Sequence, residues 1–135
     1  MEYRITPEII IELQINEIFV FGSNESGIHG AGAARIAFNC FGAKWNLGFG
    51  IAGHSFAIPT KDWDVITLSL DNIQFYVDRF LEFVKSNPHL IFYVTKIGCG
   101  LAGYEVKDIA PLFKNAINTK NIYLPIEFWN ELKLI

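Results

Sequence analysis

Short apolar runs alternate with helical patterns along this chain, and the alternation restricts the possible folds more than any other feature. The runs at residues 17–22, 55–60, 90–95 and 121–124 are brief and mostly apolar, which is typical of strands covered on both faces. Between them, apolar residues recur at helical spacing over 31–41, 70–86 and 108–117. Strands that alternate with helices predict an α/β layered domain with a largely parallel or mixed sheet.

Three further segments complete the predicted organisation. Thr6 followed by Pro7 is a helix-start signal, and we expect a short helix that ends near Leu13. Residues 43–54 are rich in glycine and aromatic side chains and predict an irregular loop. The apolar segment 125–135 is expected to pack on the domain or to form a dimer contact.

Length and composition exclude several classes of protein. A chain of 135 residues predicts one domain spanning 1–135, and 51% hydrophobic with 19% charged residues is a globular composition. The net charge of −3 argues against a broad nucleic-acid surface. No apolar run approaches the length of a membrane span, and Cys40 and Cys99 are too few for a disulfide framework. We therefore expect a cytoplasmic protein with free thiols and no membrane partner.

Glycines cluster behind the predicted strands. The 11 glycines lie between residues 22 and 53 or between residues 98 and 103, and nowhere else. In α/β sheets, ligands bind beyond the carboxyl ends of the strands, where the loops at 22–32, 60–64 and 97–104 are expected to meet. Glycine allows the main chain to approach a ligand, and N–H groups at a helix start favour phosphate oxygens. The pattern predicts a small-molecule cleft with main-chain walls.

The first glycine-rich loop is not a known nucleotide fingerprint. Gly30 and Gly32 are followed by Ala33, without the Gly-Lys-Ser/Thr of a phosphate-binding P-loop, and their spacing differs from the dinucleotide-binding fingerprint. Taken alone, the first loop is equally well explained as a tight turn with small residues for packing. A second glycine-rich loop after another strand favours the phosphate-binding interpretation, because two such loops can hold opposite sides of one pyrophosphate.

Several side chains near these loops have two interpretations each. Lys61, at the end of a predicted strand, is a candidate nucleophile or a solvated lysine. Tyr104 could cap a ring in the cleft or be an ordinary tyrosine at the edge of the core. Cys99 has no base nearby in the sequence, so a small residue that lets the loop fold is the better interpretation. His29 could serve as an acid, a base or a hydrogen-bond donor. No spacing typical of metal ligands occurs, and no metal or cofactor is expected.

At this point the motifs show a resemblance. Residues 20–24 (VFGSN) with 29–34 (HGAGAA) resemble the strand, asparagine and glycine-rich loop of macro domains, and residues 97–104 (IGCGLAGY) resemble their second phosphate loop. The order and spacing agree from about residue 17 to 124. Within that superfamily the sequence is most similar to a small macro-like family of phage-related and other bacterial genomes, through residues 19–24 and 109–113.

The resemblance implies a three-layer α/β/α sandwich that binds ADP-ribose or a related NAD-derived nucleotide. Asn24 would hydrogen-bond the distal ribose, the two loops would hold the diphosphate through N–H groups, and Tyr104 would pack on the distal ribose side. The implied ligand-binding residues are Asn24, His29, Gly30, Ala31, Gly32, Ala33, Gly98, Cys99, Gly100, Leu101, Ala102, Gly103 and Tyr104.

The resemblance supports binding more than catalysis. Lys61 matches a lysine of a branch that removes ADP-ribose from proteins, but Ala34 and Ala102 stand where hydrolytic branches have aspartate. Asp62 or Glu105 could substitute for the missing acid. Four functions therefore stay open: binding of the nucleotide, hydrolysis of ADP-ribosyl bonds on a modified macromolecule with Lys61 as catalytic residue, sequestration of an ADP-ribose-type signal by a phage protein, and an interaction module whose cleft is filled by side chains.

Overall fold

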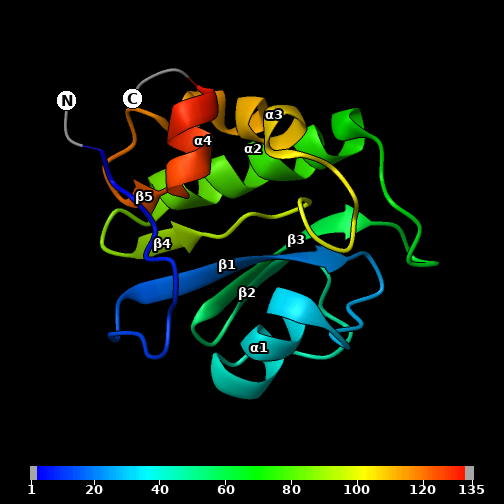
Figure 1. Ribbon diagram of the computed structural model, residues 1–135. Coiled ribbons are helices and arrows are strands. Elements are labelled where there is room, and N and C mark those ends of the chain that lie inside the picture. The colour runs from blue at the N-terminus through cyan, green and yellow to red at the C-terminus, as the bar shows by residue number, and fades with distance from the viewer. Residues whose placement is uncertain (1–2, 133–135) are drawn as a thin grey trace.

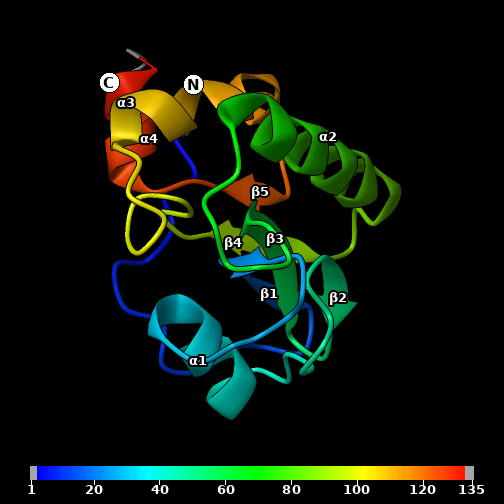
Figure 2. The same cartoon turned by 90° about the vertical axis from the view of Figure 1, so that its right-hand side faces the viewer.

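The computed structural model describes residues 3–132 as an α/β sandwich (Figure 1). A five-stranded sheet in the order β2-β3-β1-β4-β5 separates one helix, α1, from the helices on its other face, and Figure 2 shows this layering end-on. The strands are β1 (Glu17–Asn24), β2 (Gly50–Ala52), β3 (Ser55–Lys61), β4 (Ile91–Val94) and β5 (Ile122–Tyr123). The helices are α1 (Gly32–Cys40), α2 (Leu70–Ser86), α3 (Val106–Ile109), a 3₁₀ helix (Ala110–Ala116) and α4 (Ile126–Glu131).

The sheet is mostly parallel. Strand β1 pairs in parallel with β3 and β4, and β4 pairs in parallel with β5, so the carboxyl ends of these strands lie at one edge. The exception is β2, which pairs antiparallel with β3. The predicted fold class is therefore confirmed. The prediction of an irregular loop over 43–54 is wrong at β2, because Gly53 takes a φ of +57° and lets the chain turn back as a hairpin.

Two hydrophobic cores cover the two faces of the sheet. The larger core lies between the sheet and α2, α3 and α4, and the smaller core lies beneath α1. Helix α2 has the predicted bounds, and the Ser69 hydroxyl caps it by accepting a hydrogen bond from the Asn72 N–H at 3.2 Å. Its apolar stripe is buried as its spacing predicts: Ile73, Val77, Phe80, Leu81 and Val84.

The N-terminal segment differs from its prediction. Residues 6–13 form no helix, because the expected capping group is used elsewhere: the Thr6 hydroxyl donates to the Val94 carbonyl at 2.8 Å. The Thr6 N–H also donates to the Leu124 carbonyl at 2.9 Å, which ties the segment to the sheet. An apolar face for a helix is missing too, since Ile9 and Ile11 are 76% and 83% exposed.

Other elements lie where the sequence predicts them but differ from the prediction in helix type or burial. The predicted helix over 108–117 divides into α3 and the 3₁₀ helix, which has Pro111, a residue without an N–H, in its first turn. Helix α1 matches its prediction, although Phe38 of the predicted buried stripe is 42% exposed. The segment after 125 packs on the domain through Phe128 and Trp129, both fully buried in α4, while residues 133–135 lie outside the described part of the chain.

Candidate functional site

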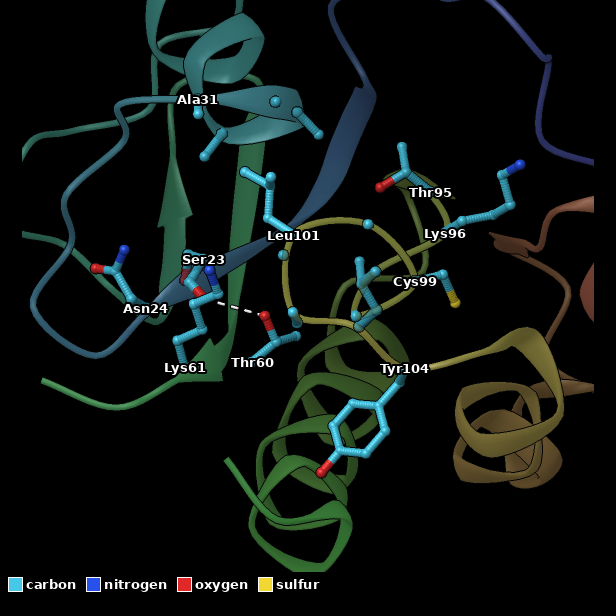
Figure 3. A pocket seen from close by; sticks show the side chains of 18 of the residues that line it. Ser23, Asn24, Ala31, Thr60, Lys61, Thr95, Lys96, Cys99, Leu101 and Tyr104 are labelled. Carbon is cyan, nitrogen blue, oxygen red and sulfur yellow. Dashed lines mark hydrogen bonds between the residues drawn. The ribbon is translucent and has the colours of Figure 1, made fainter. Parts of the chain in front are cut away.

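A cavity of about 880 Å³ opens at the carboxyl edge of the parallel strands (Figure 3). Its volume is in the usual range for small-molecule sites, about 300–1,000 Å³. The ends of β1, β3 and β4, the first turn of α1 and the second glycine-rich loop form its walls. The lining residues are Gly22, Ser23, Asn24, Ile28, Ala31, Gly32, Ala33, Ala34, Thr60, Lys61, Val65, Thr95, Lys96, Ile97, Gly98, Cys99, Gly100, Leu101, Ala102, Tyr104, Glu105 and Val106.

The first glycine-rich loop presents the start of α1 to this cavity. Ala31, the residue before the helix, is extended and provides no side-chain cap. The N–H groups of Gly32, Ala33 and Ala34 have no hydrogen-bond partner within residues 3–132, and all three residues line the cavity. Unpaired N–H groups at a helix start carry partial positive charge. This wall can therefore hold an anionic oxygen.

The second loop presents a similar row of donors. Gly98 holds its bend with a φ of +74°, and a Cβ there would lie 2.8 Å from the Cδ1 atom of Ile109. The turn that follows closes through a hydrogen bond from the Gly103 N–H to the Gly100 carbonyl at 3.0 Å. The N–H groups of residues 100–102 have no partner among the described residues, and these residues line the cavity. Successive free N–H groups of this kind form an anion-binding concavity.

The two loops lie on facing walls of the cavity. A Cβ on Gly32 would lie 3.8 Å from the Cδ1 atom of Leu101, and Figure 3 shows Leu101 directed toward the loop that carries Ala31. Both donor rows thus border the same space. The structure brings together residues 31–33 and 98–102 as the glycine spacing predicts.

Three predicted ligand-binding residues do not line this cavity: His29, Gly30 and Gly103. The His29 side chain is 1% exposed and points into the small core, where its ring meets Phe21 edge-on at 5.4 Å between centroids. Its Nε2 atom lies 2.8 Å from the Lys44 carbonyl oxygen, while Nδ1 is buried without a partner among the described residues. The prediction that the His29 side chain reaches the ligand needs correction, because its ring is buried against Phe21 and His29 does not line the cavity.

Asn24 lines the cavity, but its amide group builds the local turn. The Oδ1 atom accepts hydrogen bonds from the Ile28 N–H at 2.8 Å and the Ser26 hydroxyl at 2.9 Å, and Nδ2 donates to the Ile28 carbonyl at 2.9 Å. One Nδ2 hydrogen is left for a ligand, because an amide has two. The contact of Asn24 with a ribose stays a prediction, and its local role in the turn is an addition to it.

Tyr104 and Cys99 line the cavity, but neither presents a reactive group to it. The Tyr104 hydroxyl donates to the Leu68 carbonyl at 2.6 Å, and Figure 3 shows its ring directed away from the loops toward α2. Burial raises the pKa of the Cys99 thiol above its usual value, against the smaller lowering effect of Lys96. A raised pKa disfavours the nucleophilic thiolate, which agrees with the interpretation of Cys99 as a small loop residue.

The charged side chains that line the cavity differ in whether they form an ion pair. Lys96 forms an ion pair with Glu127 at 3.3 Å, and Glu105 pairs with Lys107 at 3.2 Å. Lys61 lines the cavity from the end of β3 and has no ion pair within the described residues. It therefore supplies an uncompensated positive charge at the site.

The acids proposed as substitutes are engaged elsewhere or absent from the wall. Asp62 does not line the cavity, and its Oδ1 atom accepts the N–H groups of Asp64 and Ile66, each at 2.9 Å. Glu105 does line it, and its carboxylate bonds Lys107 at the exposed start of α3. Among the described lining residues, Glu105 carries the only carboxylate.

Sequence reasoning missed a group of hydroxyl side chains at the strand ends. Ser23, Thr60 and Thr95 line the floor of the cavity, and each donates its hydroxyl hydrogen to a main-chain carbonyl, of Gly48, Ser23 and Val20 respectively. Their oxygen lone pairs stay available to a ligand donor. The signal was present, because a hydroxyl residue stands at or near the end of each predicted central strand.

Fold and site together define an α/β sandwich with a cavity at the carboxyl edge of its parallel strands, lined in part by the glycine and alanine residues of two loops. In comparisons with known proteins, no family model, no curated protein and no solved structure matches the chain. No helix within residues 3–132 has the length and apolar character needed to cross a membrane. The same residues hold no group of three or more His, Cys, Asp or Glu side chains placed for a metal ion.

Proposed function

We propose that this protein binds ADP-ribose or a related NAD-derived nucleotide, with the diphosphate between its two glycine-rich loops. One observation carries the proposal: the N–H groups of residues 32–34 and 100–102 border one cavity from facing walls and have no partner among the described residues. Free N–H groups at a helix start and in a glycine-rich turn favour phosphate oxygens, so two such rows on one cavity favour an anionic ligand with more than one phosphate. The resemblance of both loops to macro domains supports the same ligand class.

The distribution of charge supports an anionic ligand as well. The chain as a whole carries a formal net charge of −3, which would repel a diphosphate. At the cavity the balance is reversed: within residues 3–132, Lys61 has no ion pair, and the one lining carboxylate, on Glu105, is paired with Lys107. We therefore expect the Lys61 ammonium group to contribute most to the electrostatic attraction of the ligand.

Binding without turnover is better supported than hydrolysis. A hydrolase of ADP-ribosyl bonds needs a group that activates water or the substrate hydroxyl, commonly a carboxylate. Ala34 and Ala102 both line the cavity at the positions where the resemblance implies aspartate. Lys61 alone favours hydrolysis, so ADP-ribosyl hydrolase is the second candidate function. Sequestration of an ADP-ribose-type signal is compatible with binding alone.

An interaction module without a small ligand is less well supported. That function predicts a cleft filled by side chains, whereas most residues of the two loops at this cavity are glycine or alanine. An occupant smaller than a protein segment accounts better for a cavity of about 880 Å³.

Calorimetric titration with ADP-ribose tests binding directly. The decisive variant is Gly100→Asp, which adds a carboxylate beside the second donor row and should weaken affinity at least tenfold, or about 1.4 kcal/mol. Gly100→Ala is the matched control, because a Cβ at Gly100 meets no atom within 4 Å and alanine adds no charge. Absence of heat with wild-type protein at about 1 mM ligand would reject the proposal.

Turnover is tested separately with an ADP-ribosylated protein. Release of free ADP-ribose, followed by chromatography, should be absent from a pure binding protein. If release is seen and Lys61→Ala abolishes it, the hydrolase replaces the binding function as the conclusion. Release that continues in Lys61→Ala would remove Lys61 from the reaction.

A further inference from the structure

Two segments distant in sequence are joined by a reciprocal pair of hydrogen bonds beside the cavity. The Thr67 hydroxyl donates to the Ala102 carbonyl at 2.9 Å, and the Tyr104 hydroxyl donates to the Leu68 carbonyl at 2.6 Å. Each segment therefore supplies one side-chain donor and one main-chain acceptor. The link ties the second glycine-rich loop to the residues that precede α2.

The anchoring segment is itself fixed to the sheet. The Leu68 N–H donates to the Thr60 carbonyl at 2.9 Å, Thr67 forms a bridge with Lys61 at the end of β3, and the Leu68 side chain is 8% exposed in the larger core. The Thr67 side chain is exposed and does not line the cavity. Thr67 can thus act on a ligand only through the loop that it holds.

The bond from Thr67 fixes the orientation of one peptide plane. The carbonyl of Ala102 and the N–H of Gly103 belong to the same planar peptide group and point in opposite directions. Thr67 holds the carbonyl end, and the Gly100 carbonyl accepts the N–H end at 3.0 Å. With both ends fixed, the turn stays closed and the N–H groups of residues 100–102 stay free of internal partners.

Without Thr67, the bond from the Gly103 N–H to the Gly100 carbonyl would be left to hold this peptide plane. Gly103 has a φ of +89°, and a Cβ there would meet no atom within 4 Å, so packing around Gly103 does not oppose rotation of the plane. A rotated plane would open the bond to Gly100 and could turn the Ala102 carbonyl oxygen toward the cavity. A carbonyl oxygen beside a phosphate is repulsive, because both carry negative charge.

We propose that Thr67 is a positioning residue for anion binding, which holds the second donor row in its binding orientation by bonding the Ala102 carbonyl. The inference rests on the proposed function, because it concerns the same cavity. It adds a residue that no motif in the sequence marks and that touches no ligand.

The test compares Thr67→Val, which keeps the branched shape and loses the hydroxyl, with Thr67→Ser, which keeps the hydroxyl. Thr67→Val should weaken binding of both ADP-ribose and inorganic pyrophosphate about tenfold, and Thr67→Ser should restore it to within about twofold of wild type. Thr119→Val is the control, since Thr119 lies outside the cavity lining. Unfolding midpoints in urea should be similar for Thr67→Val and Thr119→Val, because Thr67 is exposed.

The outcomes separate this inference from the proposed function. If wild-type protein binds neither ADP-ribose nor pyrophosphate, the proposed function fails. If wild-type protein binds and Thr67→Val binds equally well, only the positioning role is rejected. Equal loss in Thr67→Val and Thr67→Ser would also reject it, since the hydroxyl is common to wild type and Ser. If Thr67→Val does not fold, Thr67→Ala replaces it, and failure of both to fold counts against a purely positioning role.

Discussion

Gly48 lies directly against Asn24, so closely that a Cβ on Gly48 would be 2.3 Å from the Asn24 carbonyl oxygen. The same glycine accepts a hydrogen bond from the Ser23 hydroxyl through its own carbonyl. The segment 43–54, predicted as an irregular loop, thus supports the strand end and turn that border the cavity. Only a residue without a side chain allows this approach of two main chains.

Gly48→Ala should therefore destabilise the protein by about 1–3 kcal/mol, because the methyl group forces two main-chain segments apart. The Cβ would also meet the Glu25 carbonyl oxygen at 2.7 Å, so no small rotation relieves the clash. Urea denaturation measures the loss. Gly30→Ala is the control, because a Cβ there meets nothing within 4 Å. Equal stability of the two variants would contradict the packing described here.

The two lysines at the cavity should differ in their effect on ligand affinity. Lys61→Gln should weaken binding of ADP-ribose about tenfold and reduce its dependence on salt, because an unpaired ammonium is lost. Lys96→Gln should have a smaller effect, since Glu127 already neutralises Lys96 at 3.3 Å. Titrations at two salt concentrations measure both. A larger effect from Lys96 would show that its ion pair opens on binding.

Stability should fall as the pH rises from 10 to 12. Burial, with a smaller contribution from Glu25, raises the pKa of Tyr76 to about 12, and burial with Glu17 raises the pKa of Tyr93 to about 12. An unfolded tyrosine ionises near pH 10, so in this window the unfolded state loses protons that the folded state retains, which favours unfolding. Urea denaturation between pH 9 and about 11.5 measures the slope. The double variant Tyr76→Phe, Tyr93→Phe should flatten it.

The two cysteines should react at different rates with iodoacetamide. Cys40 is exposed on α1, whereas burial raises the pKa of the half-buried Cys99 thiol. Cys99 should therefore be labelled more slowly near pH 8, because less of it is thiolate. Mass spectrometry of Cys40→Ala and Cys99→Ala gives each rate alone. Faster labelling of Cys99 would restore it as a candidate nucleophile.

Most elements of the fold could be predicted because their signals are local. The stripe from Ile73 to Val84 lies on one helix face whatever the rest of the chain does, and α2 has its predicted bounds. The prediction of a helix after Thr6 was wrong because the Thr6 side chain has a distant partner. The Thr6 hydroxyl donates to the Val94 carbonyl, 88 residues away, and no local pattern contains that partner.

The alternation of strands and helices follows from the sequence alone, as do the positions of the two glycine-rich loops behind β1 and β4, because strand and turn preferences act over a few residues. Which groups at those loops are free for a ligand depends on long-range contacts in the folded chain. The His29 ring is buried in the core beneath α1, the Asn24 amide accepts the Ile28 N–H within its own turn, and the Thr67 hydroxyl donates to the Ala102 carbonyl. Hydrogen-bond donors and acceptors are claimed by whichever partner the fold brings near, and such partners can lie far along the chain.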